Sequence, residues 1–162
     1  MPIERVLIIG AGLGGPALAL ALARRSIRST IFELRPHASN SGGSLSLAAN
    51  ALRALDDVCG VYDRLAQQGY SYKAIEARSE DGYRFGEIAQ ADGDYAALRI
   101  MRPALHQVLL DACRDSKLID IRFGARLEAI EEDESTGVTA RFEDGSVEQG
   151  VYSFCSLRCV NR

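Results

Sequence analysis

Apolar and polar residues in the first part of the chain follow a strand, helix, strand pattern. Residues 3–9 contain a continuous apolar run from Val6 to Ile9, which is typical of a parallel strand covered on both faces. Residues 14–25 are rich in Ala and Leu and predict a helix, and residues 29–34 predict a second strand. Since crossovers between parallel strands are almost always right-handed, we expect a right-handed βαβ unit.

The next segment predicts a loop and then two helices. From 36 to 46 the chain is rich in Ser, Asn and Gly, which favours a loop. Apolar residues then fall on one face of an expected helix over 48–58. Gly60 interrupts this pattern, and a second short helix carries Val61 and Leu65.

The second half of the chain predicts mainly strands around one helix. That helix begins at Arg102-Pro103, where a proline suits the first turn, and an apolar stripe follows. Two Glu-Asp-Gly sequences, each between two strand-like segments, predict hairpin turns. The expected strands and hairpins are a hairpin over 72–90 turning at Glu80-Asp81-Gly82, a short strand over 97–101, strands over 118–124 and 126–132, and a hairpin over 137–149.

Residues 151–162 differ from the rest. They show neither helical nor alternating spacing, and they contain two of the four cysteines. We therefore expect one domain over residues 1–150, followed by an atypical tail over 151–162.

Composition restricts the classes of function. The chain has 162 residues, of which 47% are hydrophobic and 25% are charged, as in one ordinary globular domain. A net charge of −3 gives no electrostatic reason to expect nucleic acid as a partner. No apolar stretch is long enough to span a bilayer, and the first residues do not match a signal peptide. We expect a cytoplasmic protein without a membrane span.

The cysteines and histidines predict no metal site. Cys59 and Cys113 fall within helical patterns, where a buried thiol is common. Cys155 and Cys159 lie close together, but no further ligand is near them in the sequence, as a zinc site requires.

The strongest chemical signal lies between the first strand and the first helix. Gly10, Gly12 and Gly15 form a G-x-G-x-x-G pattern, and Glu33 follows at the end of the second expected strand. The first glycine allows a sharp turn, the second allows a pyrophosphate to approach the backbone, and the third allows the helix to pack closely on the strand. The N–H groups at the start of the helix favour an anion there. These features predict a dinucleotide site.

Three segments make the chain resemble the N-terminal part of the class A flavin monooxygenases, which include p-hydroxybenzoate, salicylate and kynurenine hydroxylases and tetracycline-degrading monooxygenases. The first is the glycine motif at residues 10–15. The second is Phe32–Pro36, which is similar to the family's Glu-x-Arg at the end of its second strand. The third is Arg102–Leu110, which is similar to the family's Arg-x-x-Leu-x-x-x-Leu helix start.

The resemblance implies an α/β, Rossmann-like FAD-binding domain with a parallel central sheet and added β-hairpins. It implies FAD as the cofactor, NADPH or NADH as the reductant, and an aromatic or polyketide-like small molecule as the substrate. Glu33 would accept hydrogen bonds from the adenosine ribose, Arg35 would lie beside the adenine or its ribose, and Arg102 would face the pyrophosphate or ribityl region. The cofactor-binding residues implied in this way are Gly10, Ala11, Gly12, Leu13, Gly14, Gly15, Glu33, Arg35 and Arg102.

The resemblance covers less than half of a typical family member, so two functions stay open. One is an FAD-dependent oxidoreductase domain. The other is a truncated, non-catalytic nucleotide-binding remnant, with residues from 151 onward arising from a frame shift or an intron. An NAD-dependent dehydrogenase fragment is less favoured because it leaves Arg102 unexplained. The sequence assigns no catalytic residue: Tyr70, Tyr72, Tyr83 and Tyr95 could line a substrate pocket, but packing is the commoner role of aromatic strand residues. Incomplete cover of the sheet predicts self-association through exposed apolar surface.

Overall fold

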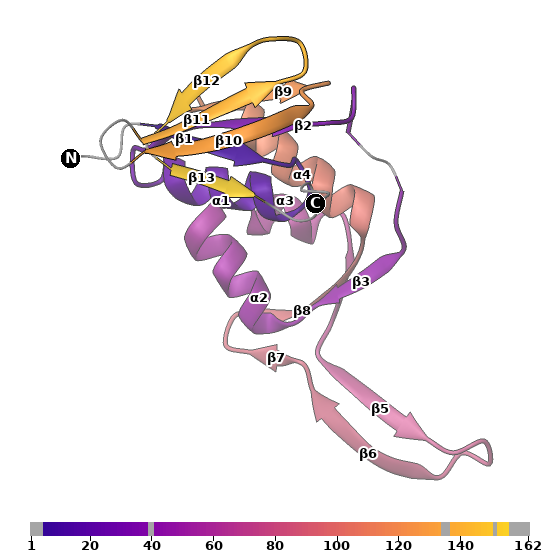
Figure 1. The fold of residues 1–162 in the computed structure, drawn as a ribbon. Helices are drawn as coiled ribbons and strands as arrows, with labels where there is room; N and C mark the ends of the chain where they lie inside the picture. Colours follow the sequence, from indigo (N-terminus) through magenta and orange to yellow (C-terminus); the bar gives the residue numbers. More distant parts are fainter. Residues whose placement is uncertain (1–4, 39–40, 134–136, 151, 156–162) are drawn as a thin grey trace. The chain divides into compact units, whose positions relative to one another are not determined.

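A computed structural model of the chain describes residues 5–38, 41–133 and 137–150, and the backbone of 152–155 (Figure 1). It divides into two compact units. The first comprises residues 1–40 and 109–162, and the second comprises residues 41–108. Each unit has its own sheet, and each is described by itself below.

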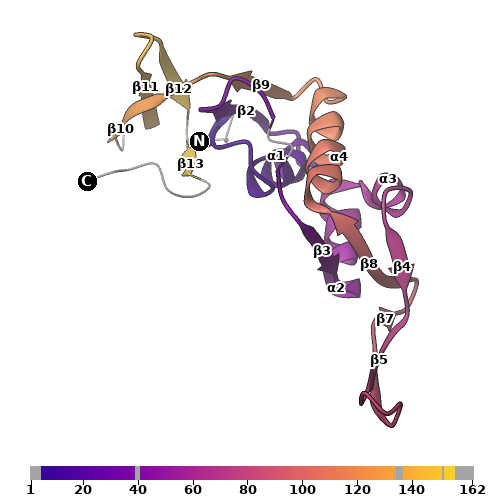
Figure 2. The ribbon, with the colours of Figure 1, turned by 90° about the vertical axis from the view of Figure 1, so that its right-hand side faces the viewer.

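The first unit is built on a parallel sheet. Its strands are β1 (Arg5–Ile9), β2 (Arg28–Glu33), β9 (Ile119–Phe123) and β13 (Tyr152–Cys155), in the order β13-β1-β2-β9. Helix α1 (Gly14–Ala23) connects β1 to β2, which confirms the βαβ unit and the α/β fold class. Helix α4 (Arg102–Arg114) runs from the second unit into the first and leads to β9 (Figure 2).

Both faces of β1 and β2 are covered, so the incomplete cover expected from the sequence is wrong for these two strands. Alternate residues of β1 point to opposite faces, and α1 packs on the face of Ile8. The other face meets an antiparallel sheet of β10 (Leu127–Asp133), β11 (Gly137–Phe142) and β12 (Val147–Gly150). There the rings of Phe32 and Phe142 lie 4.6 Å apart between centroids, within one buried apolar cluster. The continuous apolar run of β1 is therefore explained by burial on two sides.

The second unit combines a four-stranded antiparallel sheet with short helices. Three of its strands lie in the order β3-β8-β4, and β7 also pairs with β8. The buried residues Leu52, Leu65, Leu98 and Ile100 contribute to the core of this unit. In a separate hairpin, β5–β6, every strand residue is exposed. The elements are β3 (Ser44–Leu47), α2 (Ala49–Ala54), a π-helical segment η1 (Leu55–Cys59), α3 (Tyr62–Ala66), β4 (Tyr70–Tyr72), β5 (Ala74–Arg78), β6 (Arg84–Ala89), β7 (Ala91–Asp92) and β8 (Tyr95–Met101).

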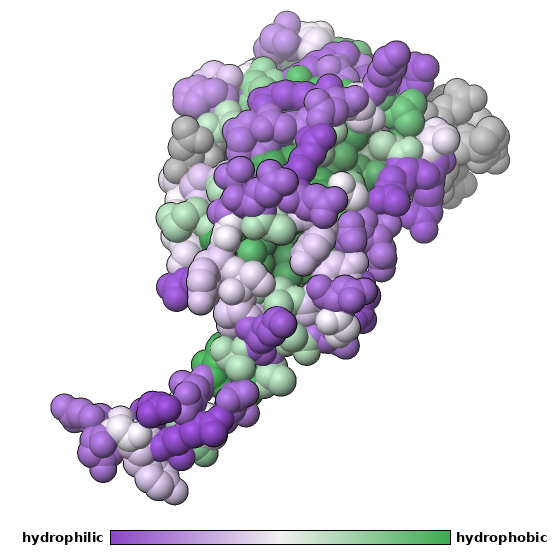
Figure 3. Space-filling view, turned by 180° about the vertical axis from the view of Figure 1, so that it is seen from behind, coloured by the Kyte–Doolittle hydropathy of each residue, from purple (hydrophilic) through white to green (hydrophobic). Residues whose placement is uncertain are grey.

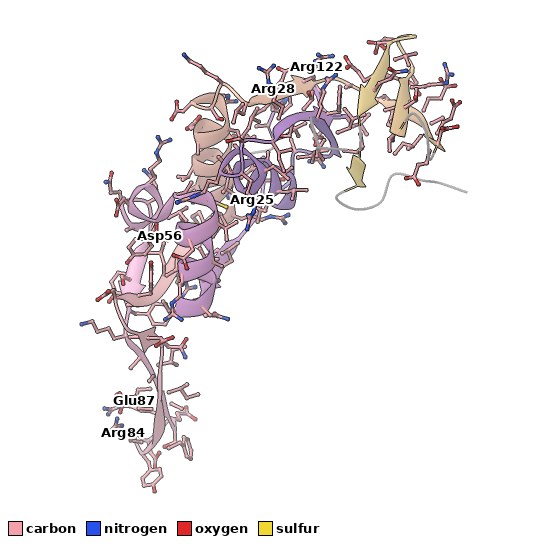
Figure 4. All side chains as sticks on the ribbon, turned by 90° about the vertical axis from the view of Figure 1, so that its left-hand side faces the viewer. Arg25, Arg28, Asp56, Arg84, Glu87 and Arg122 are labelled. Atoms are coloured by element: carbon pink, nitrogen blue, oxygen red, sulfur yellow. The ribbon has the colours of Figure 1, made fainter. Side chains whose placement is uncertain are left out.

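Hairpin β5–β6 separates charged from apolar residues. Glu76 and Glu87 are directly opposite in the register and form ion pairs with Arg84, whereas Ile75 and Ile88 pair at the adjoining position. Arg84 and Glu87 lie side by side in Figure 4, and Figure 3 shows hydrophilic residues along much of this hairpin. Ile88 is 64% exposed. The structure thus leaves apolar side chains of the hairpin open to solvent.

Most expected elements are present, but one expectation in this region is wrong. Residues 36–46 do not form a loop throughout, because Ser44–Leu47 pair with β8 as strand β3. The helix expected over 48–58 is α2 followed by a π-helical turn, and it ends at Gly60 with a φ of 68°. Strand pairing with distant residues and a change of helical register are not visible in local spacing.

The tail also differs from its expectation in part. Tyr152–Cys155 form β13 and pair in parallel with β1, from Val6 opposite Tyr152 to Ile9 opposite Cys155. A strand therefore forms here although the sequence shows no strand periodicity, because the free edge of β1 supplies the hydrogen-bonding partners. Cys159 and residues 156–162 lie outside the described residues.

Candidate dinucleotide site

The turn after β1 has the conformation that the glycine motif predicts. Gly10 follows Ile9 directly and has a φ of 107°, in the region that favours glycine. Its N–H donates a 2.7 Å hydrogen bond to the carbonyl of Phe32, which ties the turn to the end of β2. The turn therefore lies at the carboxyl ends of two neighbouring parallel strands, where open α/β sheets bind their ligands.

Gly12 and Gly15 are required for different reasons. A Cβ atom on Gly15 would lie 2.1 Å from the carbonyl oxygen of Gly10, so the fold itself excludes a side chain there. A Cβ atom on Gly12 would meet nothing within 4 Å, and the φ of Gly12 is not positive. Gly12 is exposed, so neither packing nor backbone conformation within the described chain explains a glycine at this position.

Helix α1 presents uncapped backbone donors beside this turn. Leu13 is its N-cap residue and makes no side-chain capping hydrogen bond, and the first turn contains no acidic residue. Gly14, the first helical residue, is exposed. The N–H groups and the positive end of the helix dipole at such a terminus suit an anionic group, including a diphosphate.

Glu33 connects the glycine turn to the end of β2. One carboxylate oxygen, Oε2, accepts a 2.8 Å hydrogen bond from the backbone N–H of Ala11. The other, Oε1, accepts a 3.1 Å hydrogen bond from the backbone N–H of Arg35. The side chain is half-buried, and these contacts orient it while leaving further acceptor positions on both oxygens. A carboxylate held beside the glycine turn can accept hydrogen bonds from sugar hydroxyls.

The two predicted arginines are in different units. Arg35 follows β2 and is exposed near Glu33. Arg102 begins α4 in the second unit, where its N–H donates a 3.0 Å hydrogen bond to the carbonyl of Gly43. Its side chain packs along Gly42, where a Cβ atom would lie 3.0 Å from the Arg102 Cδ. The structure brings the glycine motif, Glu33 and Arg35 together, and the cofactor role of Arg102 stays a prediction.

A cavity in the first unit lies at the other end of the strands from the glycine turn. Its volume is about 400 Å³, and it includes Arg5, Arg28 and Arg122, of which the latter two are labelled in Figure 4. Arg5 and Arg122 both form ion pairs with Glu148. Since it lies at the amino ends of the strands, this cavity is not part of the predicted dinucleotide site.

The tyrosines named in the sequence analysis lie in three environments. The ring of Tyr83 packs edge-on against Phe85 on hairpin β5–β6. The Tyr95 hydroxyl donates a 2.7 Å hydrogen bond to Asp56, and its ring packs edge-on against Tyr62. The hydrogen bond to Asp56 raises the pKa of Tyr95 to about 12. Tyr70 and Tyr72 instead line a cavity together with Arg99, which the sequence analysis did not single out. The alternation along β8 contained a signal for Arg99, because it is a charged residue between two apolar ones.

Two further features bear on the function classes. Among the described residues, no group of three or more His, Cys, Asp or Glu side chains could hold a metal ion. Within the same residues, no helix has the length and apolar character needed to cross a membrane.

Three features define a dinucleotide-binding domain: a parallel sheet with this glycine turn, a helix without a side-chain cap, and the Glu33 carboxylate hydrogen-bonded to the turn. The chain belongs to the FAD binding domain family, whose sequence model matches residues 4–153. Its curated relatives include the FAD-dependent monooxygenase pynG of Aspergillus niger, which is 31% identical over 87% of this chain. The 6-hydroxynicotinate 3-monooxygenase of Bordetella bronchiseptica is 32% identical over 90% of this chain.

The chain spans about a third of the length of these relatives: 33% of pynG and 38% of the hydroxynicotinate enzyme. Solved structures agree on the fold. The p-nitrophenol 4-monooxygenase PnpA of Pseudomonas putida DLL-E4 matches 94% of this chain and 40% of its own, with a TM-score of 0.82 and 22% identity. The tetracycline destructase Tet(51) matches 96% of this chain and 39% of its own, with a TM-score of 0.72 and 22% identity.

Proposed function

We propose that this chain holds the adenosine diphosphate half of FAD in a monooxygenase that uses NADH or NADPH and hydroxylates an aromatic or polyketide-like small molecule. The bound flavin would supply the redox chemistry with the nicotinamide and with O₂. The chain's own residues would bind and orient the cofactor. No catalytic residue is assigned.

The environment of Gly12 is the observation that carries this proposal. Its missing side chain is not needed by the fold, and it leaves backbone open beside the uncapped start of α1. A diphosphate fits this arrangement because it needs close approach to N–H groups. The cradle would consist of Gly10, Ala11, Gly12, Leu13, Gly14 and Gly15, with Glu33 on the ribose, Arg35 beside the adenosine, and Arg102 toward the pyrophosphate or ribityl chain.

A non-catalytic nucleotide-binding domain is the second candidate. It is favoured by the fact that the glycine turn and Glu33 account for the adenosine half of FAD alone. Such a domain would bind FAD weakly and would not support oxidation of NADPH.

The remaining parts of the proposal concern the setting of this site. Residues 1–150 would form the FAD-binding domain, in a cytoplasmic protein that acts on a small molecule. Hairpin β5–β6 supports self-association, because Phe85 and Ile88 are exposed on a two-stranded sheet with no further strand paired to it among the described residues. Sedimentation at increasing protein concentration tests this point, and a monomer at all concentrations would contradict it.

Calorimetric titration with ADP, FAD and FMN tests where the cofactor is held. The wild-type chain should bind ADP and FAD, and it should bind FMN much more weakly, because FMN lacks the adenosine half. Glu33→Gln should weaken ADP and FAD binding by about tenfold or more, because a charge-assisted acceptor is lost. Glu80→Gln is the matched control, because it makes the same change at an exposed glutamate in the turn between β5 and β6.

The outcomes separate the candidates. ADP and FAD binding with oxidation of NADPH supports the monooxygenase, and binding without reduction of the flavin supports the non-catalytic domain. Equal affinity for FMN and FAD, or an unchanged affinity in Glu33→Gln, would contradict the assigned site.

A further inference from the structure

Charged residues gather on one face of the parallel sheet, at the amino ends of three neighbouring strands. Arg5 on β1 stands directly opposite Arg28 on β2, and Thr30 of the same strand stands opposite Asp120 on β9. Paired residues of neighbouring strands share a face, and every second residue of a strand returns to it. Arg122, two residues after Asp120, therefore lies on this face as well. The register thus brings three arginines together at the end of the sheet that lies away from the glycine turn.

Carboxylates compensate only two of these arginines. Glu148 on β12 forms an ion pair with Arg5 at 2.9 Å and another with Arg122. The Nε of Arg122 also donates a 2.9 Å hydrogen bond to Asp120. In the described part of the chain, Arg28 forms no ion pair, although it stands opposite another arginine. Like charges directly opposite each other on neighbouring strands repel, so contacts within the described chain do not explain Arg28 at this position.

A second uncompensated cation lies beside Arg28. Lys117 precedes β9, and the residues next in sequence join the two segments, because the N–H of Ser29 donates a 2.9 Å hydrogen bond to the carbonyl of Leu118. Both Arg28 and Lys117 are exposed. Neither side chain hydrogen-bonds or forms an ion pair with another of the described residues. Their N–H groups are therefore available to a group from outside the chain.

The cavity of about 400 Å³ at the amino ends of the strands contains these groups. Its lining includes Arg5, Arg28, Lys117 and Arg122, and among the described lining residues Asp120 alone carries a carboxylate. Arg28 and Arg122 are near each other at this end of the sheet in Figure 4. The volume lies within the range of ordinary small-molecule sites, which is about 300–1,000 Å³. A hollow with this excess of positive charge favours an anionic ligand.

We propose that this cavity binds a phosphate dianion, either as free phosphate or as the phosphate monoester of a small molecule. Arg28 would hold two phosphate oxygens through parallel hydrogen bonds, and Lys117 would donate to the third. A phosphate group suits two uncompensated cations, because it carries a charge of about −1.5 to −2 at pH 7 and three strong acceptor oxygens. Arg5 and Arg122 would add to the positive potential while Glu148 holds them in place.

Titration of the full chain with inorganic phosphate tests the proposal, by calorimetry and by thermal melts, with sodium chloride at equal ionic strength as the reference. Saturating phosphate should raise the melting temperature of the wild type by about 2 °C or more above that in chloride. Arg28→Gln and Lys117→Gln should each weaken phosphate binding by about fivefold or more, because a charge-assisted hydrogen bond is lost. Arg28→Lys should retain part of the affinity, since the charge remains and the two-oxygen contact does not.

Two controls make the result specific. Lys73→Gln makes the same change at an exposed lysine of the second unit and should leave the phosphate affinity unchanged. Arg28→Gln should keep or raise the melting temperature without phosphate, because it removes the repulsion with Arg5. Three results would each overturn the proposal: no difference between phosphate and chloride in the wild type, unchanged affinity in both Arg28→Gln and Lys117→Gln, or an equal loss in Lys73→Gln.

Ribose 5-phosphate distinguishes the two sources of the phosphate group. If the wild type binds it more tightly than inorganic phosphate, the cavity accepts a phosphorylated small molecule. Equal or weaker binding assigns the cavity to the free ion. Loss of this binding in Arg28→Gln should accompany either result, because both ligands present the same group to the guanidinium.

The same titrations in the presence of FAD separate this cavity from the proposed cofactor site. FAD should not displace phosphate, because the glycine turn and the cavity lie at opposite ends of the strands. Displacement of phosphate by FAD would place the ion at the glycine turn and overturn the proposal. Phosphate binding by a chain that binds neither ADP nor FAD would reject the cofactor site and leave the phosphate site standing.

Discussion

Replacing Gly12 and Gly15 by alanine, one at a time, separates binding from folding within a single motif. The two variants add the same methyl group three residues apart. At Gly15 the new Cβ atom would lie 2.1 Å from the Gly10 carbonyl oxygen and 3.4 Å from Cγ2 of Ile8. At Gly12 it would have no neighbour within 4 Å. The first change therefore acts on the protein itself, and the second acts on a ligand that lies against the turn.

The expected magnitudes follow from these contacts. The clash at Gly15 is with backbone, which cannot rotate away, so overpacking should cost about 1–3 kcal/mol of unfolding free energy. For a chain of 162 residues this corresponds to a melting temperature lower by about 2–12 °C. Gly12→Ala should lower the unfolding free energy by no more than about 0.5 kcal/mol. The lower conformational entropy of the unfolded chain acts in the opposite direction and contributes about 0.4–1 kcal/mol of stability.

Thermal melts monitored by circular dichroism, paired with FAD titrations, measure both effects. Gly12→Ala should keep the wild-type melting temperature without ligand and lose at least about tenfold in FAD affinity, or about 1.4 kcal/mol. Gly15→Ala should lower the melting temperature even without FAD. The reasoning would be refuted by a Gly12→Ala variant that unfolds as early as Gly15→Ala, or by one that binds FAD as well as the wild type.

Three other predictions concern stability and ionisation. Phe142→Ala should lower the unfolding free energy by about 3–5 kcal/mol, because it empties the centre of a buried cluster, and a denaturant melt with a loss below about 1 kcal/mol would disprove this. Asp56→Asn should bring the pKa of Tyr95 from about 12 back toward 10.0, since the carboxylate that holds its proton is neutralised; ultraviolet titration of tyrosine ionisation measures the change. Burial raises the pKa of Glu148, but hydrogen bonds from two arginines outweigh it and lower the pKa below the ordinary 4.5. The stability that Glu148 contributes is therefore present above pH 4.5 and is lost as the pH falls through its folded pKa. In Glu148→Gln the unfolding free energy should fall less steeply between pH 4.5 and lower pH, and the same pH dependence as in the wild type would argue against this role.

Local spacing determined much of the first unit. The apolar run of β1, the glycines after it and Glu33 lie within one continuous segment, so their arrangement follows from strand, turn and helix preferences of neighbouring residues. The same holds for the antiparallel strands β11 and β12, where Asp144-Gly145 marks the turn between them. Gly15 packs on Gly10 as its place in the motif predicted.

Tertiary contacts decided the features that depend on residues distant in sequence. Ser44–Leu47 become a strand because β8 lies beside them, and Tyr152–Cys155 become one because β1 has a free edge. Arg99 faces a cavity only because the register places Ser46 and Tyr70 on either side of it. The amino-acid sequence alone thus determined the βαβ unit and its glycine turn, since these are local. Strand partners and shared faces required the folded sheet, because hydrogen-bond pairing between distant segments leaves no periodic signal in either segment.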